Sequence, residues 1–544
     1  MKKQILIALL MISASLSASA QDAYKILSEC DTIVKAKIEK VTLGSREVRH
    51  FVYEYPSKDA DGQPVTISGI VMVPADIANG TTPCDGIILF NHHTIGSPKE
   101  APSQGELDVP CGILANPLKP NYIVVMSDYI GYGSSIDHKV AYLCGDTNAR
   151  NSLDGLLAAR QLLDDKQIPQ GRFLFNMGYS QGGTESMYIA KLRDMEYKDR
   201  GITFDKTFSG GGMLDCEQAY SAFVEKDQCD AINDVAMFLI SVNENCHLGI
   251  DYHDLFQEPL ASHVQEVIET KNKSVLSEIG VSKLDSLHQL LMPDYMDLRS
   301  DAAKKLLAKL AEIKITNGWT PDTTQNYYIE HSRHDNFVPI KCARTIIPWM
   351  QSQGFKPSLV PGKTRLQTNT IVFKLKHQPS AVVWFIQTLA AVQAWPVLYY
   401  EGEQNRYYHN VIKDLNLMKV VKFLESMGID LRKMFAANEA HFYRAPSRNT
   451  DFFELLQQIN DTLAKVDLTI TDVFEMITDS GITIEDIMQV YEYIKGSDDS
   501  SAGEAIVFGE DVEVPIYLLK LYEKILADWF MLGGVDVQYD QWGW

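Results

Sequence analysis

The chain has 544 residues, of which 45% are hydrophobic and 22% charged; this is the composition of a globular protein long enough for two or more domains. Its net charge of −21 argues against a nucleic-acid partner, because phosphate binding requires clustered lysine and arginine. Most of the negative charge lies in residues 451–544, which hold 20 acidic and 4 basic residues.

Residues 1–20 have the three-part layout of a secretory signal peptide. Two lysines precede an apolar run from Ile5 to Ile12, and small residues follow up to Ala20. The run is too short for a membrane anchor, which needs about 20 apolar residues. We therefore expect cleavage after Ala20 and a periplasmic or extracellular protein without a stable membrane span. Export permits disulfides, so the eight cysteines are expected to be buried thiols with at most one or two bridges.

From about residue 48 to residue 401 the pattern alternates between strands and helices. Residues 48–56 and 64–74 alternate apolar and polar side chains, as a hairpin at the edge of a sheet would. Short apolar runs typical of buried parallel strands follow at 86–91, 121–128, 172–178, 202–210 and 326–331. The pattern predicts an α/β fold, with an open, mostly parallel sheet and helices on both faces.

Two segments have a helical pattern without clear strands. Residues 216–320 would lie over the carboxyl ends of the strands as a helical cap, inside a domain of residues 21–401. Residues 402–544 are expected to form an acidic, all-helical C-terminal extension with a solvated outer face.

The stretch RFLFNMGYSQGGTESM, residues 172–187, changes from a strand pattern to a helix pattern at Ser180. Gly178 and Gly182 give the G-x-S-x-G spacing that lets a sharp turn raise the serine hydroxyl above the sheet. The amide of Gln181, at the start of the helix, can then donate to an oxyanion. We expect Ser180 to be a nucleophile; the alternative is a serine that only caps the helix.

A serine nucleophile needs a base, and the base needs an acid that orients it. In this type of fold the acid follows a late strand and precedes the histidine. Asp335 follows the strand at 326–331 and is the preferred acid. Asp322 lies before that strand and Glu330 lies inside it, so both are poorer candidates.

His377 is the expected base, because it lies where a strand pattern ends and a helix begins within residues 368–391. His331 and His334 flank the acid and are expected to shape the pocket.

The loop after the strand at 86–91 contains Asn91-His92-His93-Thr94 where a second oxyanion donor is expected. The Thr94 amide is the preferred donor and His93 the alternative. Adjacent histidines rarely bind one metal ion and no third ligand is spaced nearby, so we expect no metal and no cofactor.

Four stretches together carry a family resemblance: NHHTIGS, SDYIGYGSS, GYSQGG, and HSRHDNFVPI followed by KHQPSAVVWF. Over residues 48–400 the chain resembles α/β-hydrolases, and within them the secretory-lipase-like enzymes. The resemblance implies an α/β-hydrolase fold and esterase or lipase activity on a small-molecule or lipid ester. It also implies that Asp128 ties its loop by hydrogen bonds and that Tyr129, Tyr132 and Tyr179 bind substrate.

The expected function is therefore that of an exported serine hydrolase that cleaves carboxylic esters through an acyl-enzyme. One alternative is a prolyl-type serine peptidase, but such enzymes usually add a β-propeller, and fewer than 30 residues separate Ala20 from the first expected strand. Another is a non-catalytic binding protein whose acidic helical tail docks a protein partner.

Overall fold

The computed structural model describes residues 23–38, 41–105, 108–115, 120–355, 366–371, 375–400, 505–508 and 512–515. The predicted signal peptide lies outside the described residues. So does nearly all of the extension predicted for residues 402–544.

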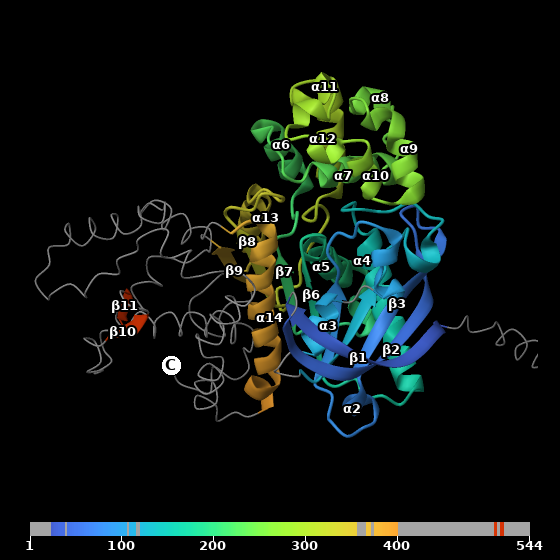
Figure 1. Ribbon diagram of the computed structural model, residues 1–544, viewed down its shortest axis with the longest axis vertical. Coiled ribbons are helices and arrows are strands. Elements are labelled where there is room, and N and C mark those ends of the chain that lie inside the picture. Colours follow the sequence, from blue (N-terminus) through green and yellow to red (C-terminus); the bar gives the residue numbers. More distant parts are fainter. Residues whose placement is uncertain are drawn as a thin grey trace, which may run out of the picture.

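A nine-stranded sheet runs through the molecule, in the order β1-β2-β3-β5-β4-β6-β7-β8-β9 (Figure 1). The first three strands form an antiparallel meander, and β3 pairs antiparallel with β5. The remaining pairs from β5 to β9 are all parallel, which confirms the predicted mostly parallel sheet. The strands are β1 (Lys25–Ile38), β2 (Val41–Lys58), β3 (Pro64–Pro74), β4 (Gly86–Asn91), β5 (Tyr122–Ser127), β6 (Phe173–Tyr179), β7 (Lys206–Gly210), β8 (Tyr327–Ser332) and β9 (Leu366–Ile371).

The expectation that the hairpin at 48–56 and 64–74 forms the sheet edge is wrong, because β1 lies outside it. This strand exposes Leu27 and Ile33, so it lacks a clear buried face. Val34 and Ala36 are its buried side chains, and ion pairs across the β1–β2 ladder also help to hold it, with Arg49 bound to Asp31. A strand of this kind has no hydrophobic alternation by which the sequence could reveal it.

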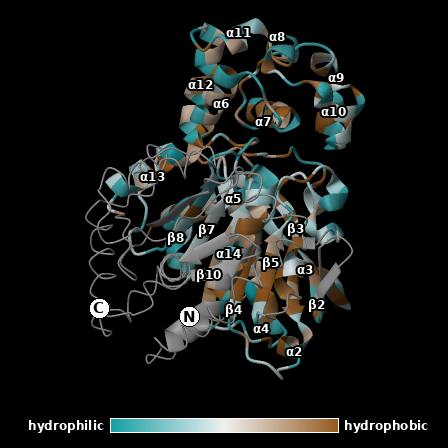
Figure 2. Ribbon diagram, turned by 60° about the vertical axis from the view of Figure 1, so that its left-hand side comes forward, coloured by the Kyte–Doolittle hydropathy of each residue, from teal (hydrophilic) through white to brown (hydrophobic). Residues whose placement is uncertain are grey.

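Helices cover both faces of the sheet. On one face α4 (Thr147–Asp165), α5 (Gln181–Leu192) and α13 (Lys341–Ser352) bury side chains such as Leu156, Ile189 and Ile346. On the other, α3 (Asp108–Leu114) and α14 (His377–Tyr400) bury Ile113 and Trp384. The central strands are consequently apolar on both sides, as the brown strands in Figure 2 show. None of the helices in the described ranges is long and apolar enough to cross a membrane.

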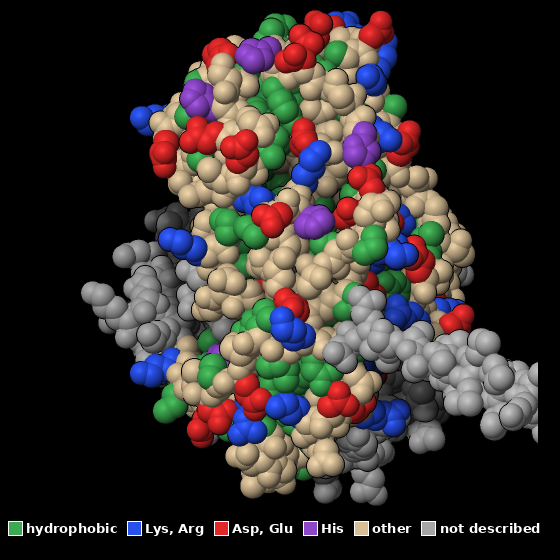
Figure 3. Space-filling model, turned by 90° about the vertical axis from the view of Figure 1, so that its right-hand side faces the viewer, with side chains coloured by type: hydrophobic (Ala, Val, Ile, Leu, Met, Phe, Trp, Pro, Cys, Tyr) green, Lys and Arg blue, Asp and Glu red, His purple; other side chains and the backbone are tan. Residues whose placement is uncertain are grey.

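The predicted helical cap is inserted between β7 and β8 and lies above the carboxyl ends of the parallel strands (Figure 1). It has its own core, in which Leu239, Val264 and Leu310 are fully buried. Its surface carries acidic and basic side chains interspersed, and Figure 3 shows the same mixture on the sheet domain below. Its helices are α6 (Cys216–Lys226), α7 (Ile232–Asn245), α8 (Tyr252–Leu255), α9 (Leu260–Thr270), α10 (Ser274–Glu278), α11 (Pro293–Met296) and α12 (Asp301–Ile313), and a further short helix, α2 (Ala75–Ala78), follows β3.

The prediction that residues 402–544 are helical throughout is wrong for the two short segments that are described there. Strands β10 (Ala505–Phe508) and β11 (Val512–Pro515) pair antiparallel. Valine and isoleucine recur in both, and these β-branched side chains favour extended backbone over helix.

Two glycines let β4, β6 and α5 approach each other closely. A Cβ atom on Gly182 would lie 2.0 Å from the carbonyl oxygen of Asn91, and one on Gly178 would lie 2.4 Å from the carbonyl oxygen of Gly182. Both obstacles are backbone atoms, which a rotamer change cannot move. The G-x-S-x-G spacing is therefore a packing requirement of this strand–helix junction.

Gly182→Ala should destabilise the protein by about 1–3 kcal/mol, because the added methyl group forces the end of β4 away from α5. Thermal unfolding measures this. Gly112→Ala in α3 is the control, since its Cβ would meet nothing closer than 3.9 Å and should leave stability unchanged or slightly raised. Equal effects of the two substitutions would contradict the packing argument.

Candidate active site

Ser180 lies between the last residue of β6 and the first residue of α5. Its φ of 60° and ψ of −122° are strained for a residue with a side chain. The turn is held by two backbone hydrogen bonds, from the Ser180 amide to Gly210 and from the Thr184 amide to Ser180. The local structure thus raises the hydroxyl above the carboxyl edge of the sheet, as the sequence predicted.

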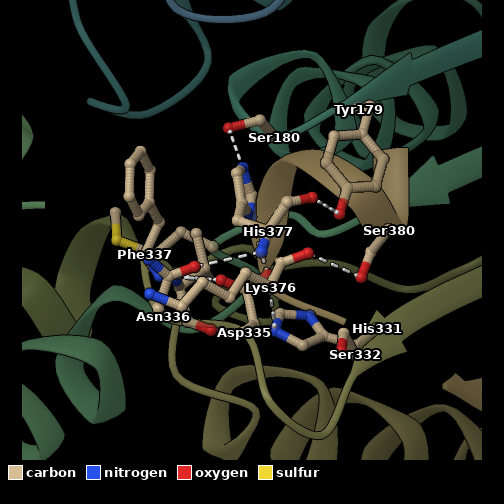
Figure 4. Close-up of polar contacts among 12 residues, drawn as sticks. Tyr179, Ser180, His331, Ser332, Asp335, Asn336, Phe337, Lys376, His377 and Ser380 are labelled. Carbon is tan, nitrogen blue, oxygen red and sulfur yellow. Dashed lines mark hydrogen bonds and ion pairs between the residues drawn. The ribbon is translucent and has the colours of Figure 1, made fainter. Parts of the chain in front are cut away.

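Ser180, His377 and Asp335 come together in one hydrogen-bonded chain (Figure 4). The Nε2 atom of His377 lies 2.8 Å from the Ser180 hydroxyl, and its Nδ1 atom lies 2.6 Å from Asp335 Oδ2. In the tautomer that satisfies both contacts, Nδ1 donates to the carboxylate and Nε2 accepts from the serine. His377 is the first residue of α14, and Asp335 lies in the loop between β8 and α13.

The Asp335 carboxylate is buried, and it accepts several hydrogen bonds from protein groups. Its Oδ1 atom accepts hydrogen bonds from the amides of Phe337 and Val338, each at 2.8 Å. Burial opposes ionisation, yet the hydrogen bond from His377 and the nearby His331 hold the pKa of Asp335 below its ordinary value. The acid therefore stays charged beside the imidazole.

His331 lies beside the acid, with its Nε2 atom 3.7 Å from Asp335 Oδ2. The His331 Nε2 atom also donates to the carbonyl of Val338, at 2.9 Å. Burial lowers the pKa of His331, although the nearby Asp335 carboxylate raises it in part. Burial therefore favours the neutral form of this ring. The exposed His334 lies further along the same loop.

Three further residues hold His377 in place, and sequence reasoning identified only one of them. The Asn336 side chain accepts from the His377 amide at 3.0 Å, and the Phe337 ring stacks on the imidazole at a centroid distance of 5.3 Å. Tyr179, predicted to bind substrate, donates its hydroxyl to the His377 carbonyl at 2.8 Å (Figure 4). The position of Asn336 and Phe337 directly after the acid is the only signal that could have found them.

The expected oxyanion donors lie around the same cavity as the serine. Gln181 is the first residue of α5, so its amide has no acceptor within the helix. His93 and Thr94 also line this cavity, and the Thr94 hydroxyl is 2.9 Å from that of Tyr142.

The start of this loop is held by Asn91, which the sequence reasoning did not single out. Its amide nitrogen donates to Asn176 Oδ1 at 2.8 Å and to Ser186 Oγ at 2.9 Å. The buried side chain therefore ties the end of β4 to both β6 and α5.

A cavity of about 380 Å³ opens above Ser180 and His377, between the sheet domain and the cap. One wall is polar, because the Lys273 ammonium donates to Asp234 at 2.6 Å. The rest is mostly apolar, with contributions from Val109, Leu143, Met213, Val235, Phe238 and Phe337.

Tyr129 and Tyr132 do not line this cavity, contrary to expectation. The Tyr129 ring stacks on His92 at 4.0 Å, and Tyr132 packs in a small separate cluster with Ile95. Both are almost fully buried, so they support the loop behind the site. Asp128 does tie that loop, because it accepts hydrogen bonds from the Ser68 hydroxyl and the Ser103 amide.

The two rejected acids have other partners. Asp322 lies before β8 and forms ion pairs with Arg193 and Lys198. Glu330 is buried within β8 and accepts from the Tyr328 hydroxyl. In the described part of the chain the hydrogen bonds of the His377 ring go to Ser180 and Asp335 and to neither of these two carboxylates.

Solved structures with the same arrangement of helices and strands share little sequence with this chain. A proposed hydrolase from Legionella pneumophila matches with a TM-score of 0.56 at 18% identity, over 68% of this chain and 96% of its own. The rice cell wall degrading esterase LipA from Xanthomonas oryzae matches with a TM-score of 0.53 at 18% identity, over the same shares. These likenesses and the sheet order establish the α/β-hydrolase fold. No protein-family model and no curated protein matches the sequence.

A second buried carboxyl, that of Glu185, lies on α5 one turn beyond Gln181. Its Oε1 atom accepts from the Asn148 amide at 3.1 Å, and its Oε2 atom has no hydrogen-bond partner among the described residues. Burial raises its pKa to about 8, which the side chains of Asn148 and Gln181 only partly offset.

Glu185→Gln should change how stability depends on pH. The folded protein holds the Glu185 proton up to about pH 8, whereas the unfolded chain releases it near pH 4.3, so wild-type stability should fall as pH rises through this window. The variant has no carboxyl group at this position to lose a proton. Its free energy of unfolding should therefore increase relative to that of the wild type by on the order of 2–4 kcal/mol between pH 5 and pH 9. Denaturant unfolding across this range measures the difference. The exposed Glu269→Gln is the control, and a parallel course for all three proteins would refute the argument.

Proposed function

We propose that the protein is a serine hydrolase that cleaves carboxylic esters. The observation that carries this proposal is the continuous hydrogen-bonded chain from Ser180 through His377 to Asp335. Ser180 and His377 line a largely apolar cavity. The esterase named among the matching folds agrees with this reaction class.

In the first half of the reaction His377 takes the proton of Ser180 as the hydroxyl oxygen attacks the ester carbonyl carbon. The ionised Asp335 keeps Nδ1 protonated and stabilises the imidazolium that forms. His377 then gives its proton to the leaving alkoxide, and the acyl group stays on Ser180. Water, activated by the same histidine, releases the acid in the second half.

The amides of Gln181 and Thr94, with His93 as the alternative to Thr94, hold the oxyanion of the tetrahedral intermediate. Each such donor contributes about 3–4 kcal/mol to the transition state in related sites. The hydrogen bonds of Asn91 keep the loop that carries Thr94 close to the helix that carries Gln181. Because these hydrogen bonds fix the loop beside the helix, they support an oxyanion hole that is assembled before the substrate arrives.

The volume of the cavity also limits the size of the substrate. Its volume of about 380 Å³ is near the lower end of the range for small-molecule sites. Aromatic and aliphatic side chains from both the cap and the sheet domain enclose it. We therefore propose esters with short or medium acyl chains as substrates, and export by the N-terminal signal peptide as the route to them.

Ser180→Ala should remove more than 99% of the hydrolysis of p-nitrophenyl esters and all labelling by a fluorophosphonate probe, because the nucleophile is lost. Ser262→Ala, at an exposed serine of the cap, is the control and should behave as wild type. Proline-containing peptide substrates are assayed in parallel. Labelling that persists without Ser180, or cleavage of the peptides in preference to the esters, would refute the ester-hydrolase proposal.

Asp335→Asn should lower kcat by on the order of 10³–10⁴, because the amide no longer holds His377 in the productive tautomer. Asp322→Asn is the matched control, since it removes a carboxylate from the same region without touching the histidine. It should cost stability, measured by thermal unfolding, but leave the kcat of the folded enzyme within about twofold. Comparable kcat values for both variants would show that Asp335 does not act on the base.

A further inference from the structure

The sulfur atoms of Cys144 and Cys246 lie 3.2 Å apart, although 102 residues separate them in the sequence. We propose that these cysteines are a thiol pair that closes to a disulfide and fastens the cap to the sheet domain. All eight cysteines carry free thiols in the structure, so this bond is not yet formed there.

The backbone presents both side chains to each other. Cys144 lies in the loop before α4, between Leu143 and Gly145, which have φ values of 52° and 72°. The left-handed conformation of Leu143 is unfavourable for a residue with a side chain, so tertiary contacts must hold this loop. Cys246 caps the end of α7, where its amide donates to the Val242 carbonyl at 3.0 Å.

Other buried cysteines have different partners. The thiol of Cys216 donates to the Leu310 carbonyl at 3.2 Å, and that of Cys342 to the Asp215 carbonyl at 3.5 Å. Both therefore behave as ordinary core thiols. Among the described cysteines, 144 and 246 are the pair whose sulfurs contact each other.

The two thiols are also unequal, which decides which of them attacks an oxidant first. Cys144 is buried, whereas Cys246 is partly exposed. The contact with Cys144, helped by Lys309 and His247, lowers the pKa of Cys246 against the opposing effect of burial, while the same contact and burial raise the pKa of Cys144. Cys246 is thus the thiol that reacts first.

The reaction needs an organic disulfide, RSSR, as the oxidant. The Cys246 thiolate attacks one sulfur of RSSR, forms a mixed disulfide and releases one thiolate, which becomes RSH. The Cys144 thiol then loses its proton and attacks the Cys246 sulfur, which releases the second RSH. The products are one protein disulfide and two RSH molecules, so the two electrons lost by the cysteines reduce the oxidant.

The bond would join two walls of the cavity above Ser180. Helix α7 contributes Val235 and Phe238 and ends at Cys246, while Leu143 is adjacent to Cys144. Closing the disulfide therefore fixes the distance between the cap and the loop opposite it. This consequence for catalysis rests on the proposed ester hydrolysis, whereas formation of the bond does not.

The test begins with the full chain equilibrated with oxidised glutathione and digested without reduction. Mass spectrometry should find the peptide of Cys144 linked to that of Cys246, and dithiothreitol should separate them. The Tm of the oxidised protein should fall by about 2–8 °C on reduction. Cys246→Ser and Cys144→Ala should lose this response, whereas Cys84→Ser should keep it. Two free, fully alkylated thiols after oxidation, or a Tm that reductant does not change, would overturn the proposal.

A kinetic measurement separates the bond from its proposed effect. Reduction should raise KM for p-nitrophenyl octanoate at least twofold in wild type and leave Cys246→Ser unchanged. An unchanged KM in wild type would overturn the fastening role. Absence of any ester hydrolysis would refute the proposed function, and the linked peptide and the Tm would still decide whether the bond forms.

Discussion

The contact between the Asn91 carbonyl and the bare Cα atom of Gly182 is the constraint from which the site is built. It brings the end of β4 against the start of α5, and the Asn91 side chain then reaches Asn176 and Ser186 with its amide. The loop that carries Thr94 leaves β4 at this point, so its position is determined by the same contact. In this arrangement the backbone of Ser180 adopts a strained conformation with a positive φ.

Two buried carboxyl groups within this domain show how partners decide charge. Asp335 receives two backbone amides and the His377 imidazole, and its pKa lies below the ordinary value. Glu185 accepts from the Asn148 amide and is also favoured by the Gln181 side chain, yet its pKa rises to about 8. Burial opposes ionisation in both cases. Hydrogen-bond donors and the neighbouring histidines therefore lower the pKa of one buried acid, whereas the other is mostly protonated at neutral pH.

Local patterns were enough to predict the parts of the fold that are apolar on both faces. Strands β4, β5, β6 and β8 and the turn at Ser180 follow from runs of buried residues and from glycine spacing, and the order of the acid and the histidine follows from the sheet. The edge strand β1 was missed because ion pairs and exposed side chains replace its hydrophobic pattern. Tyr129 was misplaced because sequence does not show on which side of a loop an aromatic ring packs. Asn336 and Phe337 were missed because their partner, His377, lies 41 and 40 residues away in the chain.

The position of the cap has an evolutionary consequence. The chain leaves the sheet after β7 and returns in β8, and these strands are neighbours, with Gly210 opposite Glu330. The two ends of the helical cap lie side by side, because Lys314, directly after α12, donates to Glu217 at the start of α6 at 3.0 Å. A different helical segment could therefore start and end at these two points without changing the register of the sheet. Insertions at this junction are thus a route by which one hydrolytic scaffold acquires new substrate preferences while its chemistry stays the same.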